Sequence, residues 1–271
     1  MIANKRILLM MAAVVIAATT IFAGCKKDKV KVTGVSVCPT AVMVTVGYSE
    51  TLLANVTPYD ADDRTVAWVS DKPDIASVEN GVVRMVDENY KPIFGVVTAN
   101  KIGEATITCT TNDGGYPAKT TVIVNPAPKN DDCATLVPGF YFGDLTMDEN
   151  GETSVVGTDK LITVKYHALD SVALSIDEKF KIPQMPLLGE QQMKVNCIAN
   201  MTKEEGGYKV TGKTKATLVV EVPVTIEGIF NNNVLDMNIT VELPAIAGGG
   251  IIVVNFKGIW NVGIEPCAMI D

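Results

Sequence analysis

Residues 234–243, VLDMNITVEL, alternate apolar and polar side chains without interruption. The apolar positions are Leu235, Met237, Ile239, Val241 and Leu243. Successive side chains of an extended chain point to opposite faces, so this stretch has one dry face and one wet face. It is typical of an antiparallel strand that covers a core. Residues 222–230, VPVTIEGIF, repeat the pattern, and the asparagines between the two runs predict a hairpin turn.

Residues 137–263 continue this theme as alternating runs separated by Gly and Asn turns. We expect strands near residues 140–147, 158–166, 171–176, 192–200, 207–214, 216–230, 234–242 and 251–258. About eight consecutive antiparallel strands can close into an up-and-down barrel, which leaves no exposed edge. We therefore predict a β-barrel over 137–263, followed by a tail of residues 264–271.

Residues 32–126 have a different pattern, in which short runs rich in Val, Ile and Thr alternate with clusters of turn-forming residues. Short predicted strands separated by turns are typical of a β-sandwich. The stretch NPAPKNDDC, residues 125–133, breaks the pattern with two prolines, so we expect a stiffened linker over 127–136. The predicted fold class is all-β, with a sandwich followed by an eight-stranded barrel.

Three stretches of the first half, VTGVSVCPTAVMVTVG, AWVSDKPDIASVENGVV and GEATITCTT, resemble the group 2 bacterial immunoglobulin-like domain. The resemblance covers about residues 32–125 and implies an Ig-like sandwich, a module that usually spaces or displays another domain and occurs in some adhesins. Residues 84–103 are longer than the family pattern, and we expect a strand with an inserted loop there. Trp68 is expected to pack between the sheets, with sugar stacking as the lesser alternative.

Four stretches of the second half resemble the calycin-like β-barrel domain of bacterial lipoproteins: GFYFGDLTMDENG, ITVKYHALDSVALSI, VTIEGIFNNNVLDMNITVELP and IIVVNFKG. The shared feature is mostly the alternation with Gly and Asn turns. The resemblance implies a calycin-like barrel.

The N-terminus predicts an export signal. Lys5 and Arg6 precede an uncharged apolar run, residues 7–22, that is shorter than the roughly 18 to 20 residues of a membrane span. The run ends in IFAGC, which resembles the lipobox of bacterial lipoproteins and implies cleavage after residue 24 and a lipid on Cys25. An ordinary signal peptide followed by an unrelated cysteine is the alternative. Residues 25–31 would form a tether, and Lys26 in place of Asp implies, by the same resemblance, the outer membrane.

Charge excludes one class of partner. Removal of residues 1–24 takes two of the 23 basic residues and none of the 31 acidic ones, which changes the net charge from −8 to −10. An acidic body repels phosphate backbones, so nucleic acid is not expected to bind.

The cysteines of an exported protein can form disulfides. If Cys25 carries lipid, five remain, so at least one is free or intermolecular. We expect a Cys133–Cys267 bridge, because these residues bracket the barrel, and a Cys38–Cys109 bridge inside the sandwich. Cys197 is expected to be a buried, inert thiol.

The stretch GYKVTGKT, residues 207–214, matches the phosphate-loop pattern, but a phosphate loop must lead into a helix. Here the flanking residues alternate like a strand, so neither nucleotide nor another cofactor is expected. His167 is the single histidine, which leaves nucleophile–base mechanisms without support, and no metal motif occurs. The acidic group Asp60, Asp62 and Asp63 is expected to be a solvated turn. We predict no catalytic residues.

The sequence favours a non-catalytic outer-membrane or cell-surface lipoprotein whose sandwich presents the barrel for binding or adhesion to a glycan or protein. Two alternatives stay open, a carrier of a small apolar ligand and a glycan-active enzyme with two distant carboxylates. In the carrier, the ligand would contact inward-facing residues of the barrel. These are Met193, Val195, Ile226, Phe230, Leu235, Met237 and Ile239. Whether the interior is filled, and whether the protein faces the periplasm or the exterior, the sequence leaves undecided.

Overall fold

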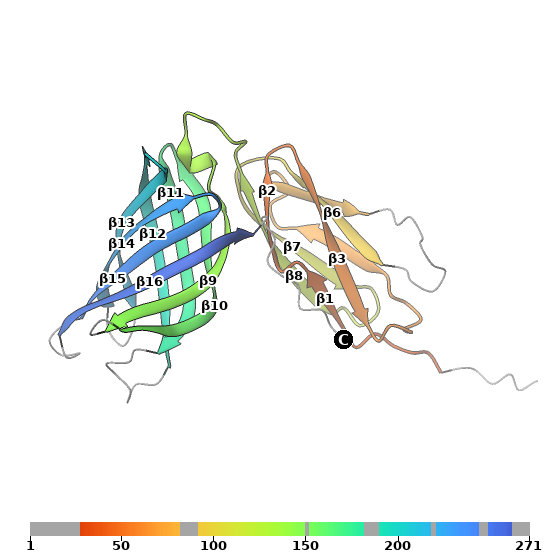
Figure 1. Cartoon of the computed structure of the whole chain (residues 1–271). Coiled ribbons are helices and arrows are strands. Elements are labelled where there is room, and N and C mark those ends of the chain that lie inside the picture. Colours follow the sequence, from red (N-terminus) through yellow and green to blue (C-terminus); the bar gives the residue numbers. More distant parts are fainter. Residues whose placement is uncertain are drawn as a thin grey trace, which may run out of the picture.

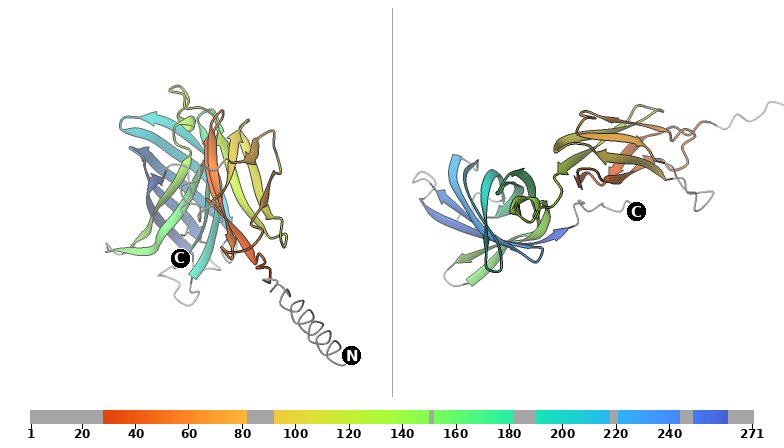
Figure 2. Two further views of the ribbon diagram at one scale, coloured as in Figure 1. Left: turned by 90° about the vertical axis from the view of Figure 1, so that its right-hand side faces the viewer. Right: turned by 90° about the horizontal axis from the view of Figure 1, so that it is seen from above.

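The computed structural model describes residues 28–81, 92–149, 152–181, 190–217, 221–243 and 249–261. These residues form a β-sandwich and a closed β-barrel that lie side by side (Figures 1 and 2). The predicted all-β fold, an Ig-like sandwich followed by an eight-stranded antiparallel barrel, is confirmed. Among the described residues, no helix has the length and apolar composition needed to cross a lipid bilayer.

The sandwich consists of two four-stranded sheets, ordered β1-β3-β6-β5 and β2-β8-β7-β4. Its strands are β1 (Gly34–Cys38), β2 (Ala41–Thr45), β3 (Ser49–Thr57), β4 (Val66–Ser70), β5 (Ala76–Asn80), β6 (Ile93–Ala99), β7 (Gly103–Thr111) and β8 (Pro117–Asn125). Leu52, Val97 and Ile107 are fully buried between the sheets. Within residues 84–103, where a strand with an inserted loop is expected, β6 is the strand; residues 82–91 lie outside the described residues, so the loop stays a prediction.

Trp68 packs between the two sheets, as the sequence predicts. It lies on β4, while the facing position on β6 is Gly95. A Cβ atom added at Gly95 would lie 2.8 Å from the indole ring. The missing side chain of Gly95 therefore makes room for the ring, which packs against the core of the sandwich while Trp68 stays partly exposed.

The barrel strands follow one another around the cylinder in chain order. They are β9 (Gly139–Glu149), β10 (Glu152–Ala168), β11 (Ser171–Lys181), β12 (Glu190–Glu204), β13 (Gly207–Thr217), β14 (Glu221–Asn231), β15 (Val234–Leu243) and β16 (Gly250–Asn261). The cylinder closes because β9 pairs with both β10 and β16. The single run expected over 216–230 is instead the end of β13 and most of β14.

Period-two burial fills the barrel interior. On β15, Leu235, Met237 and Ile239 are at most 1% exposed, while Asp236 and Asn238 between them are exposed. The same alternation on the other strands joins their inner side chains into one hydrophobic cluster.

A short turn closes one end of the barrel. The 3₁₀ helix η1 (Cys133–Thr135) precedes β9, and the side chain of Asp132 caps it by accepting a hydrogen bond of 3.2 Å from the Ala134 N–H. Cys133 and Ala134 are buried members of the barrel's hydrophobic cluster. The end of the segment expected to be a linker is therefore part of the barrel (Figure 1).

Two polar contacts join the sandwich to the barrel. The Lys165 ammonium lies 2.6 Å from the Glu104 carboxylate, and the backbone N–H of Tyr166 donates to Asn125 Oδ1 at 3.2 Å. Both contacts connect β10 of the barrel with β7 or β8 of the sandwich.

Candidate functional site

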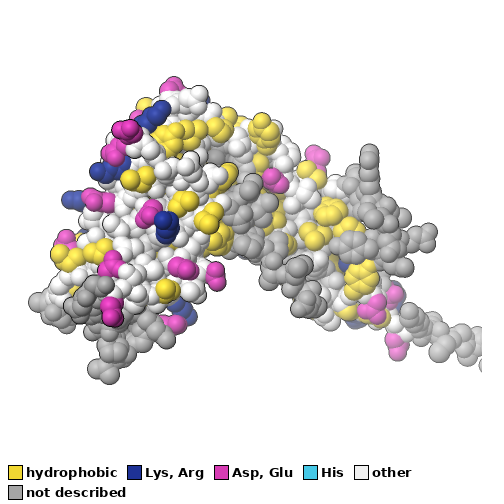
Figure 3. Space-filling model, viewed as in Figure 1, with side chains coloured by type: hydrophobic (Ala, Val, Ile, Leu, Met, Phe, Trp, Pro, Cys, Tyr) yellow, Lys and Arg dark blue, Asp and Glu magenta, His cyan; other side chains and the backbone are white. Residues whose placement is uncertain are grey.

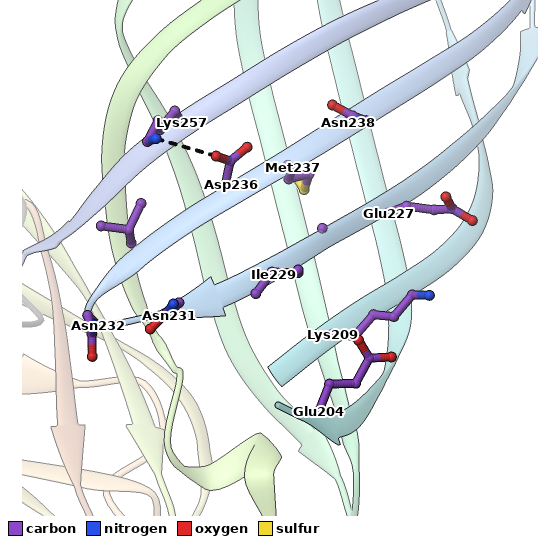
Figure 4. Close-up of a pocket in the computed structure, with 12 residues that line it drawn as sticks. Glu204, Lys209, Glu227, Ile229, Asn231, Asn232, Asp236, Met237, Asn238 and Lys257 are labelled. Atoms are coloured by element: carbon purple, nitrogen blue, oxygen red, sulfur yellow. Dashed lines mark ion pairs between the residues drawn. The ribbon is translucent and has the colours of Figure 1, made fainter. Parts of the chain in front are cut away.

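A groove of about 660 Å³ crosses the outer face of the barrel over β13, β14, β15 and β16 (Figure 4). Its lining residues are Glu204, Lys209, Glu227, Gly228, Ile229, Asn231, Asn232, Val234, Asp236, Met237, Asn238 and Lys257. None of these residues is aromatic. The charges of both signs and the side-chain amides make the groove suited to polar contacts in several directions.

Strand register builds the groove. Lys209 pairs with Ile229, Ile229 with Asp236, and Asp236 with Lys257, so four residues from four strands form one row across the outer surface. Within this row the Lys257 ammonium lies 3.5 Å from the Asp236 carboxylate. Both side chains are well exposed, so this ion pair adds little stability and its charges stay accessible to a partner.

Gly228 draws two strands together beneath the groove. An added Cβ at this position would lie 2.6 Å from the backbone oxygen of Asp236 and 2.7 Å from the Cβ of Met237. Only a residue without a side chain permits this approach of β14 to β15.

An apolar strip borders the groove on the outer face. Val234 pairs with Ile259, and Ile259 pairs with Phe142 of β9. Ile259 is 67% exposed and Ile229, within the groove, is 45% exposed. Charged residues of both signs are interspersed with such apolar side chains over the barrel in Figure 3. A surface that mixes exposed apolar side chains with charges is typical of a protein interface.

The groove residues were not among the sequence predictions. A signal for them exists, because Ile229, Val234 and Ile259 are apolar at positions that the alternation assigns to the wet face. Apolar residues at solvent-facing positions indicate a contact surface when strand pairing places them next to one another. Which residues of neighbouring strands pair cannot be deduced from the sequence of one strand.

The seven residues proposed to contact an apolar ligand all lie in the barrel interior. Met193, Val195, Ile226, Phe230, Leu235, Met237 and Ile239 are at most 3% exposed and belong to one packed cluster. The hollows of the described residues include the groove, one beside Arg64 in the sandwich, and one between the domains. Met237 borders the groove, and the role of the seven residues as a ligand pocket stays a prediction.

Both expected disulfides are wrong. Cys109 and Cys133 carry free, buried thiols, whereas Cys38 is disulfide-bonded. The partner of Cys38 lies outside the described residues, as do Cys25 and Cys267. The Cys133 thiol donates to the carboxylate of Asp170, in the β10–β11 hairpin, at 3.4 Å. Cys197 is a buried free thiol, as expected.

Burial makes these thiols poor nucleophiles. Desolvation raises the pKa of Cys109 to about 11, and desolvation together with the nearby Asp170 raises the pKa of Cys133 to about 11. Burial also raises the pKa of Cys197. A thiol that stays protonated at neutral pH does not attack an electrophile.

The phosphate-loop pattern of residues 207–214 is part of strand β13 and pairs along its length with β14. It therefore lacks the helix whose N-terminal amides would hold phosphate. His167 lies at the end of β10, where its Nδ1 is 3.1 Å from Ser171 Oγ. The Ser171 hydroxyl also donates to the Ala168 carbonyl within the same hairpin. His167 and Ser171 therefore stabilise the turn between β10 and β11.

The acidic turn of the sandwich is held by local hydrogen bonds. Asp63 accepts from the hydroxyl and the N–H of Thr65, and these bonds lower its pKa. Asp62 accepts from the Val30 N–H at 2.8 Å. No group of three or more metal-ligating side chains occurs within the described residues.

Residues 31–124 match the family described as bacterial Ig-like domain (group 2). An uncharacterized protein of Clostridium acetobutylicum is 35% identical over 91 residues, which are 34% of this chain and 20% of that protein. An alpha-L-arabinofuranosidase of Bifidobacterium longum is 28% identical over 186 residues, which are 63% of this chain and 16% of that enzyme. The chain thus spans a fifth or less of the curated relatives it matches.

Among solved structures, domains 1-6 of surface layer protein SbsC give a TM-score of 0.30 at 14% identity, covering 81% of this chain and 25% of that one. Domains 5-6 of the same surface layer protein give 0.30 at 16% identity, covering 83% of this chain and 96% of that one.

Proposed function

We propose that this chain, whose first half is a bacterial Ig-like domain and whose second half is a closed barrel, is a non-catalytic lipoprotein of the bacterial outer membrane. The lipid on Cys25 holds it to the membrane, the sandwich spaces the barrel from the anchor, and the barrel's outer groove binds a protein partner. The lipobox-like sequence supports the anchor, and Cys25 itself lies outside the described residues.

The groove is the observation that carries the binding role. It combines accessible charges with exposed apolar side chains on rigid, paired strands. An interior filled by its own side chains leaves the outer surface as the place where the barrel makes contacts. The absence of aromatic residues among its described lining favours a protein over a glycan, because sugar rings pack best on aromatic faces.

Site-specific photocrosslinking on intact cells tests the binding role. A photoreactive amino acid at Ile229 lies in the groove, and one at Ile198 provides a matched control, since Ile198 is 52% exposed on β12, away from the groove. We expect a discrete crosslinked product at Ile229 that charge reversal at Asp236 removes. Equal products at both positions, or none at Ile229, would contradict a partner in the groove.

Two measurements test the location. Cys25→Ala is expected to move the protein from the membrane fraction to the soluble fraction and to abolish its labelling by radioactive palmitate. Protease added to intact cells is expected to remove the barrel. Survival of the barrel would place it inside the outer membrane and would end the proposal of an exterior partner.

A further inference from the structure

A cleft lies between the sandwich and the barrel. It measures about 350 Å³ and is lined by residues of β2, β3, the connecting segment and β16. Three prolines, Pro126, Pro128 and Pro138, form part of its walls. Clefts of this size between domains are common sites for small ligands.

Two aromatic residues, Tyr48 and Trp260, line the cleft. Tyr48 follows the turn after β2, and its backbone is held on both sides, by its N–H to the Thr45 carbonyl at 3.0 Å and by its carbonyl to the Ala99 N–H at 3.0 Å. Tyr48 as a whole residue is nevertheless 68% exposed. Trp260, at the end of β16, donates from Nε1 to the Pro138 carbonyl at 3.2 Å. The two residues thus come from different domains: the Trp260 indole is held by a side-chain hydrogen bond, and Tyr48 is held through its backbone.

Among the described residues, Glu50 is the one charged residue that lines the cleft. Glu50 lies near the start of β3 and is half-buried. Within the described part of the chain, its carboxylate makes no hydrogen bond and no ion pair, and no Lys or Arg lines the cleft. A carboxylate in a mostly apolar cleft attracts a cation more strongly than it would in open water.

We propose that this cleft binds an organic ammonium group, with Glu50 as the counter-ion and Tyr48 and Trp260 as aromatic walls. A quaternary or substituted ammonium combines a positive charge with an apolar surface, and aromatic faces bind such cations through their quadrupole. The net charge of −8 favours the approach of cations to the chain. This site is separate from the outer groove and does not depend on the proposed partner.

Calorimetric titration of the full chain tests the proposal with two probes of nearly equal shape. Choline carries the charge, and 3,3-dimethyl-1-butanol is its neutral counterpart. We expect choline to bind at least about tenfold more tightly than the neutral alcohol, since the alcohol lacks the attraction to the carboxylate and the ring faces. Equal affinity for the two probes, or no binding of choline, would overturn the assignment.

Variants assign the residues. Glu50→Gln is expected to weaken choline binding about tenfold, whereas Glu79→Gln, a change of an exposed residue at the end of β5 and outside the cleft, should leave it unchanged. Tyr48→Phe keeps the ring and should retain binding, while Tyr48→Leu should lose it several-fold. Circular dichroism verifies that each variant is folded. Undiminished binding in Glu50→Gln would refute the role of the carboxylate.

Discussion

The packing of β12 against β13 inside the barrel predicts a specific coupling between two residues. Gly212 on β13 pairs with Ala199 on β12, and Cys197 lies two residues before Ala199 on the same inner face. A Cβ added at Gly212 would lie 2.5 Å from Cys197 Sγ and 3.1 Å from Ala199 Cβ. Both separations are shorter than an ordinary contact of about 3.5–4.0 Å.

Each single substitution should therefore destabilise the barrel for an opposite reason. Gly212→Ala overfills the interior and is expected to cost about 1–3 kcal/mol. Cys197→Ala removes one buried atom and is expected to cost about 1 kcal/mol, because it leaves a small cavity. In the double variant the new methyl group occupies the space that the sulfur vacates. Its loss of stability should be smaller than the sum of the two single losses by at least about 1 kcal/mol.

Urea unfolding followed by circular dichroism, together with calorimetry to separate the two domains, measures this coupling. Cys109→Ala supplies the control, because Cys109 is equally buried but lies in the sandwich, so its effect should add to that of Gly212→Ala. Additivity between Gly212→Ala and Cys197→Ala within about 0.5 kcal/mol would refute the close contact and the register of β12 on β13.

Three further results are expected. Peptide mapping without reduction should link Cys38 to Cys25 or Cys267 and leave Cys109, Cys133 and Cys197 free for alkylation; a Cys38–Cys109 peptide would contradict the structure, and a link to Cys25 would exclude lipid there. The pKa of Cys109 and of Cys133 is raised from 9.0 to about 11, so the stability that each buried thiol contributes is fully present below pH 9 and is lost as pH rises toward 11. Between pH 9 and 11 the urea midpoint of a Cys109→Ala/Cys133→Ala variant should therefore fall less steeply than that of the unsubstituted protein. Parallel plots of midpoint against pH for the two proteins would argue against these raised pKa values. Gly95→Ala should destabilise the sandwich by about 1–3 kcal/mol, because its Cβ meets the Trp68 ring, and should leave the barrel's calorimetric transition in place; a change confined to the barrel would be inconsistent with this packing.

The sequence predicted the features that depend on local pattern. The alternation in residues 234–243 identifies β15 and its buried face, and Gly and Asn turns between similar runs are enough to predict a closed barrel. Trp68 was assigned to the space between the sheets because its strand and its neighbours follow the Ig-like order.

Features that depend on distant pairing were not predicted. The disulfides failed because proximity in the fold, and not position at the ends of a domain, decides which sulfurs meet. The turn η1 was taken for linker because two small residues, Cys133 and Ala134, among polar neighbours give no periodic signal. The outer groove depends on the register of four strands, and the cleft on how two domains meet.

The end cap of the barrel has a mechanical consequence. The segment that joins the two domains runs directly into η1, so a force that pulls the domains apart acts along the chain on η1, and on β10 only through the Glu104–Lys165 and Asn125–Tyr166 contacts. Besides the burial of Cys133 and Ala134, the cap is held by isolated hydrogen bonds, including the Asp170 N–H to Asp132 at 3.2 Å and the Cys133 thiol to Asp170 at 3.4 Å. The wall is held by ladders of many paired residues on both sides of β9, with register shifts near Gly157 on the β10 side. Under such a force the η1 cap is expected to detach first. The hydrophobic interior of the barrel would then be exposed at that end while the strands stay paired.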